Sequence, residues 1–175
     1  MKPLTGYMAG ANLGHWISQY GKQSCEHWDN YIKESDIKRM SGWGMDHVRV
    51  PVDYFLFEDD ANPGVYDENR LKYIDGVLSW CKNNGMNMIL DLHHAPGFFF
   101  GNGAKNDLFT SVKSQKRFLN IWRFFAERYK NEGDNLIFEL LNELVWDSAE
   151  PWNLLWREAV GEIHKISANR RIIIG

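Results

Sequence analysis

The sequence has few cysteines and no long apolar run. Cys25 and Cys81 are the two cysteines among 175 residues, which is too few for a disulfide scaffold, so we expect two unpaired thiols. No apolar stretch approaches the roughly 20 residues that cross a bilayer, and residues 1–6 lack the apolar core of a signal peptide. We therefore expect no membrane segment, and a location either in the cytoplasm or outside the cell after removal of a leader.

Clustered positive charge is also absent. Twenty Lys and Arg residues oppose 23 Asp and Glu residues, which gives a formal net charge of -3 with both signs interleaved along the chain. Nucleic acids and anionic membranes are bound by clustered basic residues, so neither is an expected partner. No serine or cysteine lies in a nucleophile elbow, which leaves acyl transfer without support.

Phosphate-binding glycine loops are missing as well. Gly97, Gly101 and Gly103 follow an expected strand, but their spacing fits neither a dinucleotide fingerprint nor a P-loop. The sequence therefore predicts no nucleotide cofactor, and no other cofactor is expected.

Strand-like and helix-like segments alternate along the chain. Strands are expected at residues 8–13, 48–50, 86–90, 136–141 and 171–175, and helices at about 27–42, 71–81, 118–129 and 152–166. Pro51 is expected to end the second strand, and Ser35 with Asp36 to cap the later part of the first helical stretch. This alternation predicts a parallel sheet covered by helices.

The number of units sets the expected architecture. Four strand–helix units and a fifth strand are about half of a (β/α)8 TIM barrel, which needs roughly 250 residues when closed. We therefore interpret residues 1–175 as a single α/β half-barrel domain. An open, doubly wound sheet is the alternative that the length permits, although such folds usually carry the glycine loop that is missing here.

Polar residues interrupt the apolar strands near their carboxyl ends, where active sites of parallel α/β folds are built. Arg49 lies in the second strand, Asp91 and His93 end the third, and Asn142 and Glu143 follow the fourth. Arg49 and Asp91 are equally well explained as an ion pair that braces the sheet. Glu139 is expected to be a structural partner of Arg49 deeper in the sheet.

Glu143 has little structural reason to follow an apolar strand, so we interpret it as a general acid. An apolar setting would favour its protonated form, and Asn142 is placed to hold either its carboxyl group or a substrate hydroxyl. His93 and His94 are neighbours that point to opposite faces of a strand, which disfavours a shared metal ion. We expect His93 to orient Glu143 or bind substrate, and His94 to lie at the rim.

Four motifs together resemble glycoside hydrolase family 5, especially its cellulase, lichenase and endoglucanase C branch. They are Asn12-Leu13-Gly14 with Trp16, Val48-Arg49-Val50-Pro51, Asp91-Leu92-His93-His94-Ala95-Pro96-Gly97 and Phe138-Glu139-Leu140-Leu141-Asn142-Glu143. The resemblance covers essentially the whole chain. It implies a (β/α)8 barrel that cleaves internal β-1,4 bonds of β-glucans with retention of configuration.

The resemblance also implies roles for single residues. Glu143 matches the acid/base of the family and Asn142 the residue that holds the sugar 2-hydroxyl, while Arg49 matches the arginine that supports the nucleophile and His93 the histidine of the third strand. Sugar contacts are expected from the rim and from aromatic faces, at Asn12, Trp16, His94, Phe98 and Trp146.

One part of the family's pattern falls outside these residues. Its nucleophilic glutamate belongs to the seventh strand, whereas this sequence reaches the fifth. A retaining enzyme holds its two carboxyl groups about 5 to 5.5 Å apart, and Glu139, four strand residues before Glu143, would lie about 13 Å away. Asp91 is the nearest other candidate, without support from the family. We therefore expect either self-association or a complementing C-terminal half.

A non-catalytic role is the alternative. Aromatic residues make up 14% of the chain, and aromatic rings stack well on the apolar faces of sugars. A half-barrel that binds sugar without turnover, and that self-associates, would use as stacking surfaces Trp16, Phe98, Phe99, Phe100, Trp146 and Trp152. Trp152 fits equally well in a helix core.

Overall fold

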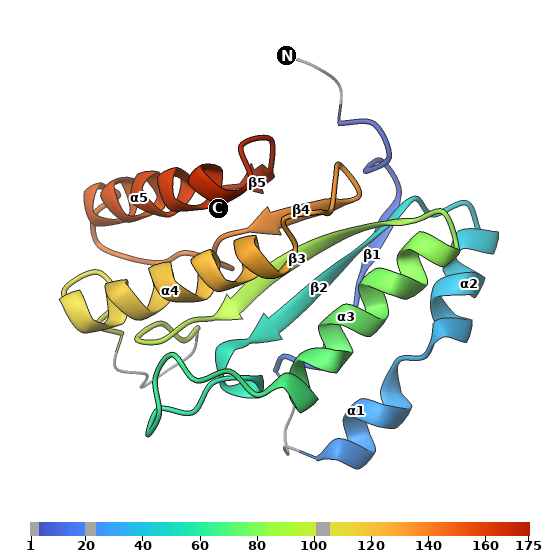
Figure 1. Ribbon diagram of the computed structural model, residues 1–175, viewed down its shortest axis with the longest axis horizontal. Coiled ribbons are helices and arrows are strands. Elements are labelled where there is room, and N and C mark those ends of the chain that lie inside the picture. The colour runs from blue at the N-terminus through green and yellow to red at the C-terminus, as the bar shows by residue number, and fades with distance from the viewer. Residues whose placement is uncertain (1–3, 20–23, 101–105) are drawn as a thin grey trace.

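The computed structural model describes residues 4–19, 24–100 and 106–175. Gly101 and Gly103 lie outside these residues. A single parallel sheet of five strands, in the order β1-β2-β3-β4-β5, forms the centre of the molecule (Figure 1). The strands are β1 (Gly10–Asn12), β2 (His47–Asp53), β3 (Asn87–His94), β4 (Leu136–Glu139) and β5 (Arg171–Ile173). Each strand is therefore hydrogen-bonded to the strands that come before and after it in sequence.

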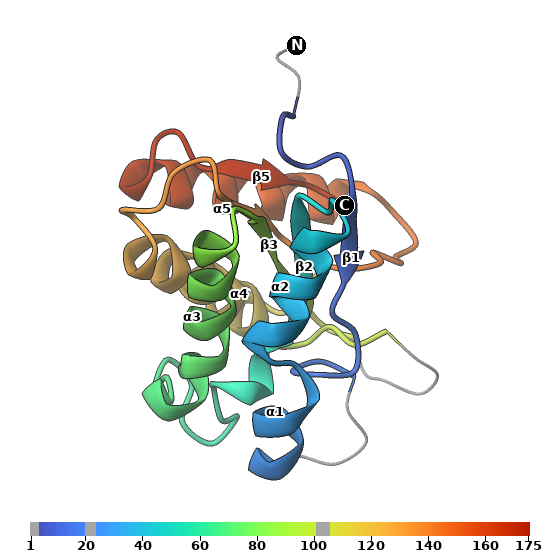
Figure 2. The ribbon, with the colours of Figure 1, turned by 90° about the vertical axis from the view of Figure 1, so that its right-hand side faces the viewer.

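This strand order decides between the two expected architectures. A doubly wound sheet reverses its winding direction part-way, whereas here the sheet is built outward in one direction from β1 to β5. The helices are α1 (Cys25–Tyr31), α2 (Glu34–Gly42), α3 (Glu68–Asn83), α4 (Val112–Arg128) and α5 (Glu150–Ile166), with a short 3-10 helix at Tyr54–Leu56. Figures 1 and 2 show α3 and α4 running along the sheet. The winding is that of a (β/α)8 barrel.

The helices begin and end at capping residues. The Asp67 side chain accepts a hydrogen bond from the backbone N–H of Asn69 at the start of α3, and the Ser111 side chain does the same for Ser114 at the start of α4. After α3 the chain passes through Gly85, whose positive φ of 66° suits glycine. Helix α3 therefore ends at Asn83, with Asn84 as its C-cap.

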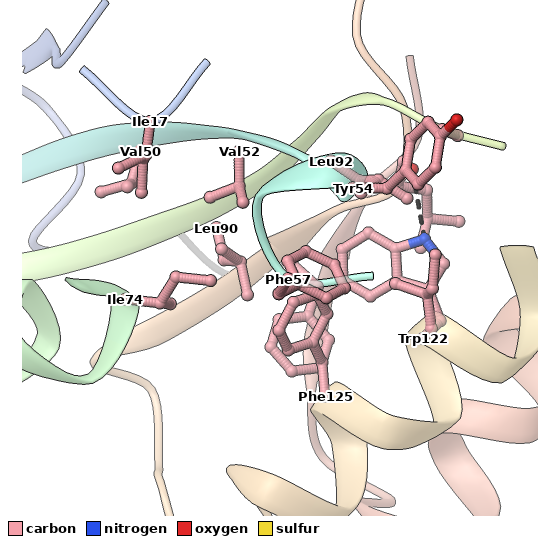
Figure 3. Packing of buried hydrophobic residues seen from close by; sticks show 14 of the residues in the cluster. Ile17, Val50, Val52, Tyr54, Phe57, Ile74, Leu90, Leu92, Trp122 and Phe125 are labelled. Carbon is pink, nitrogen blue, oxygen red and sulfur yellow. Dashed lines mark hydrogen bonds between the residues drawn. The ribbon is translucent and has the colours of Figure 1, made fainter. Parts of the chain in front are cut away.

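One face of the sheet packs against the helices and forms the main core. Alternate residues of the strands point to this side, among them Val50, Val52, Leu90 and Leu92. Figure 3 shows them meeting Ile74 of α3, and Phe125 and Trp122 of α4, near Phe57. The Trp122 indole N–H donates to the carbonyl oxygen of Leu140 over 3.2 Å, so its polar atom is satisfied inside the core.

Pro51 does not end the second strand, contrary to the sequence expectation. Strand β2 continues to Asp53, and Pro51 is paired in register with Asp91 of β3. The backbone carbonyl oxygen of Arg49 accepts from the N–H of Leu13, and the backbone N–H of Asp53 donates to the carbonyl oxygen of Ile17. The backbone polar groups of Arg49 and Asp53 therefore point toward β1 and the residues that follow it. Pro51 lies midway between Arg49 and Asp53, so its backbone nitrogen faces the same side of the strand. Strand β1 has ended at that level, so no acceptor there needs the N–H that proline lacks.

Other boundaries also differ from the expectation. The cap of α2 is Lys33, whose backbone N–H is bound by the Asp36 carboxylate, so Ser35 lies inside the helix. Strand β3 extends to His94, and β4 ends at Glu139, which leaves residues 140–149 as a loop between β4 and α5. Glu139 and Glu143 therefore do not share a strand.

The C-terminal end of α4 is held by a buried arginine from a distant part of the chain. The Arg170 guanidinium donates to the carbonyl oxygens of Tyr129, Glu132, Gly133 and Leu136 at 2.7 to 3.0 Å. These carbonyls lie at and just after the end of α4, where a cation is favoured by the helix dipole. Arg170 therefore joins the end of α4, the start of β4 and the start of β5.

Candidate active site

The face of the sheet opposite the helices is polar at its centre and apolar next to it. Strand alternation places Arg49, Asp91 and Glu139 on this face, out of phase with the valines and leucines of the core. Ile89 and Ile137, two residues earlier on their strands, form a separate small cluster with Tyr7 and Ile173. The polar side chains therefore lie toward the carboxyl ends of the strands, as expected from the sequence.

Arg49 is the centre of the polar group. Its Nε and Nη2 atoms donate to the two carboxylate oxygens of Glu139 at 2.7 and 2.8 Å. The same Nη2 lies 2.9 Å from an oxygen of Asp91, and Nη1 donates to the Asn12 side chain over 2.9 Å. The expected contacts of Arg49 with Asp91 and with Glu139 are therefore both present.

Neighbouring carboxylates explain why the partly buried Arg49 guanidinium keeps its charge. Burial alone would lower the pKa of Arg49, but hydrogen bonding to Glu139 and the charge of Asp91 raise it overall. The negative charge of Glu143 acts in the same direction. Glu143 therefore lies within electrostatic range of Arg49.

Asn142 is held in a defined orientation by Arg49. Nη2 of Arg49 donates to Oδ1 of Asn142 over 2.9 Å, and because a guanidinium has no acceptor, the amide cannot be turned the other way. Its Nδ2 atom is buried and has no acceptor among the described residues. A buried donor without a partner is costly, so this atom is available for an oxygen of a bound molecule.

His93 is held by Asp91. Its Nδ1 lies 2.8 Å from a carboxylate oxygen of Asp91, and its buried Nε2 has no hydrogen-bond partner in the described part of the chain. Of the two roles expected of His93, no hydrogen bond to Glu143 is present among the described residues, and binding of substrate stays a prediction. Burial raises the pKa of Asp91, while the hydrogen bond from His93 and the charge of Arg49 oppose that shift.

Glu143 is exposed, not set in the apolar surroundings expected from its neighbours in sequence. Leu140 and Leu141 are still buried, and the backbone N–H groups of Leu140 and Asn142 donate to the carbonyl oxygens of Ile173 and Leu92. Beyond Asn142 the chain leaves the sheet, so Val145 is exposed and Trp146 only half-buried. Glu143 also has a φ of 42°, in the left-handed region that costs a residue with a side chain about 1 to 2 kcal/mol. Such backbone strain is concentrated at functional sites.

The aromatic residues divide into core and surface. Trp16 and Phe98 are buried, and the Trp16 indole donates to the backbone oxygen of Trp28 over 2.9 Å. The structure therefore contradicts the stacking role expected of Trp16 and Phe98, because neither ring has a free face. Trp152 is also buried, which places it in the helix core.

Exposed aromatic surface remains at three of the expected positions. Phe100 is exposed, and Phe99 and Trp146 are half-buried, with Trp146 packed at 5.1 Å against Phe109. Asn12 is exposed and held by Arg49.

Asp53 is a polar site residue that the sequence analysis missed. It lies at the carboxyl end of β2, is buried, and accepts from Nδ1 of His94 over 2.6 Å. Its position after the alternating Val48, Val50 and Val52 was the available signal. Because the sequence analysis ends this strand at Pro51, it does not place Asp53 at the carboxyl end of a strand.

Two other classes of site are absent from the part of the chain that the structure describes. There, no three His, Cys, Asp or Glu side chains are grouped so that they could hold a metal ion. No described helix is long and apolar enough to span a bilayer.

The comparisons with known proteins agree with the geometry. The family model described as "Cellulase (glycosyl hydrolase family 5)" matches residues 11–175. The chain belongs to glycoside hydrolase family 5. It is 46% identical over 172 residues to Endoglucanase C of Acetivibrio thermocellus, covering 98% of this chain and 50% of that protein. It is 39% identical to Cellodextrinase A of Ruminococcus flavefaciens, covering 97% of this chain and 50% of that protein.

Solved structures support the same family fold. A crystal structure of a glycoside hydrolase matches with a TM-score of 0.82 and 26% identity, covering 95% of this chain and 52% of that one. The chain thus spans about half the length of the relatives it matches. Five parallel strands wound in one direction, matching half of such proteins, confirm the expected half of a TIM barrel.

Proposed function

We propose that residues 1–175 form the N-terminal half of a glycosidase catalytic domain that hydrolyses internal β-1,4-glucosidic bonds of β-glucans. The observation that carries the proposal is the amide of Asn142, fixed by Arg49 with an unpartnered donor, directly beside the strained Glu143. The names of two relatives, an endoglucanase and a cellodextrinase, support glucan as the substrate class.

Each residue then has a defined task. Glu143 protonates the leaving oxygen and later activates water, as the acid/base of a retaining mechanism. Nδ2 of Asn142 donates to the 2-hydroxyl of the sugar at the cleavage point, a contact that strengthens in the transition state. Arg49 keeps that amide in place, and the free Nε2 of His93 is available to a sugar hydroxyl.

We further propose that the nucleophilic carboxylate comes from polypeptide beyond these 175 residues, either a complementing C-terminal half or a second chain. Asp91 and Glu139 are poor nucleophiles, because Asp91 is fully buried and both bind Arg49. The double length of the relatives supports the complementing half.

The test is complementation. The purified chain is mixed with the C-terminal half of Endoglucanase C from Acetivibrio thermocellus, and reducing ends released from soluble cellulose derivatives are measured. We expect activity from the mixture, at least about 100-fold less with Glu143→Gln, and unchanged activity with Glu158→Gln on the exposed side of α5. A complex that binds cello-oligosaccharides but never cleaves them would favour the non-catalytic alternative.

A further inference from the structure

Asp53 uses both of its carboxylate oxygens inside the protein. Oδ1 receives Nδ1 of His94 over 2.6 Å, and Oδ2 receives the backbone N–H of Gln19 over 2.9 Å. The side chain is 1% exposed. One buried carboxylate therefore connects the end of β2, the end of β3 and the loop that follows β1.

This arrangement decides which nitrogen of His94 carries the proton. An ionised carboxylate only accepts hydrogen bonds, so Nδ1 of the neutral ring must be the donor. Nε2 is then left without a proton and becomes an acceptor. It is the only other polar atom of the side chain, and the side chain remains 11% exposed.

The ring of His94 is also fixed in orientation. It is stacked on Phe99 with ring centroids 5.1 Å apart and lies nearly parallel to Phe55 at 6.3 Å. It also meets the ring of His93 edge-to-face, with ring centroids 5.4 Å apart. His94 therefore stands rigidly next to the site that contains His93, Asp91 and Arg49.

We propose that Asp53 is a positioning residue that presents Nε2 of His94 as a fixed acceptor for a sugar hydroxyl. The inference rests on the proposed function, because it specifies how that site binds a polyhydroxylated ligand. Through Gln19, whose φ of 51° is left-handed, the same carboxylate sets the loop at the carboxyl end of β1. The histidine and this loop are thus positioned by one group.

Asp53→Asn tests the proposal with almost no change in shape. The asparagine has one oxygen, and the backbone N–H of Gln19 can only donate, so the oxygen must face Gln19. The NH2 group then faces Nδ1 of His94, which must become the acceptor, and the proton moves to Nε2. We expect nitrogen NMR of the neutral ring to show His94 protonated at Nδ1 in the wild type and at Nε2 in Asp53→Asn.

The effect on the ligand follows from the tautomer. Cellotriose binding, measured by calorimetry, is expected to weaken about tenfold in Asp53→Asn, the value of one hydrogen bond, because the sugar hydroxyl that donates to Nε2 in the wild type meets an N–H there and must direct its own proton elsewhere. In a His94→Ala background the Asp53→Asn change should have almost no further effect on cellotriose affinity, because the two residues act as a unit. Asp134→Asn, on an exposed carboxylate paired with Arg171, is the matched control and should leave both readouts unchanged.

Each result has a distinct meaning. An unchanged tautomer of His94 in Asp53→Asn would overturn the inference, as would equal cellotriose affinity in the wild type and the variant. Additive losses in the double variant would show that Asp53 acts by another route and would also overturn it. A wild-type chain that shows the expected tautomer but binds no cello-oligosaccharide would refute the proposed function, and with it the role of His94 toward sugar.

Discussion

Arg49 of β2 binds Glu139 of β4 through two parallel hydrogen bonds of 2.7 and 2.8 Å, reaching past the intervening strand β3. The pair shares its guanidinium with Asp91 on that strand and with Asn142 beyond β4. A planar group with five donors can serve all of these acceptors at once, whereas an ammonium group cannot. The two-point contact between Arg49 and Glu139 therefore fixes the plane in which Asn142 is held.

Arg49→Lys should separate positioning from folding. The lysine keeps the charge but loses the two-point contact and the bond to Asn142, so we expect the complemented enzyme to lose at least about 100-fold in activity. Unfolding in urea should show a loss of about 1 to 3 kcal/mol. Arg39→Lys, at an arginine that is 61% exposed, is the control for the change of residue type. Retention of full activity by Arg49→Lys would contradict the role assigned to the guanidinium.

Glu143→Gly should make the protein more stable and inactive. Glycine adopts a φ of 42° without the penalty that a side chain brings, so the free energy of unfolding should rise by about 1 kcal/mol. Glu158→Gly, within α5, should lower it by a similar amount because glycine is unfavourable inside a helix. In chemical denaturation, the free energy of unfolding should change in opposite directions in the two variants if the backbone at Glu143 is strained, and in the same direction if it is not.

Arg170→Ala should be among the most destabilising substitutions in the chain. It removes the donor to four carbonyl groups around the end of α4, and we expect a loss of about 3 kcal/mol or more. The neighbouring Arg171 binds the exposed Asp134, so Arg171→Ala should cost less than about 1 kcal/mol. Equal losses for the two neighbours in thermal or urea unfolding would show that the carbonyl contacts contribute little.

The segment just before β1 should loosen at low pH. The hydrogen bond from His47, together with the backbone N–H groups of Met8 and Ala9, lowers the pKa of Asp46 from 3.8 to about 2. Because this pKa is lower in the folded chain, the stabilisation is fully present above pH 3.8 and is lost as the pH falls toward 2. The protection of the Met8 and Ala9 amides, measured relative to the intrinsic exchange rate at each pH, should therefore fall over this range. Asp46→Asn should exchange faster already at neutral pH and lack this dependence.

Much of the fold follows from sequence periodicity. The stripe Leu71, Ile74, Val77, Leu78 and Cys81 predicts α3 because these residues fall on one side of a helix, and the structure buries all of them. The strand end expected at Pro51 is wrong because a missing N–H matters only where a neighbouring strand needs it, and the length of β1 is not visible in the sequence. The same error concealed Asp53.

The candidate site was predictable to the extent that it depends on strands. Arg49, Asp91 and Glu139 meet because strand parity and register bring them to one face. Burial of Trp16 and Phe98 depends on how loops fold back, which no local pattern encodes. The exposure of Glu143 likewise follows from a turn that the apolar residues around it concealed.

The arginine that binds the end of α4 also limits the order in which the protein is assembled during synthesis. Tyr129, whose carbonyl oxygen it binds, is synthesised 41 residues earlier. In a nascent chain, the carbonyl groups at the end of α4 therefore lack their arginine partner until Arg170 leaves the ribosome. Ribosome-bound chains that stop just short of that residue should therefore be cut by proteases near Tyr129, and those that extend past it should resist.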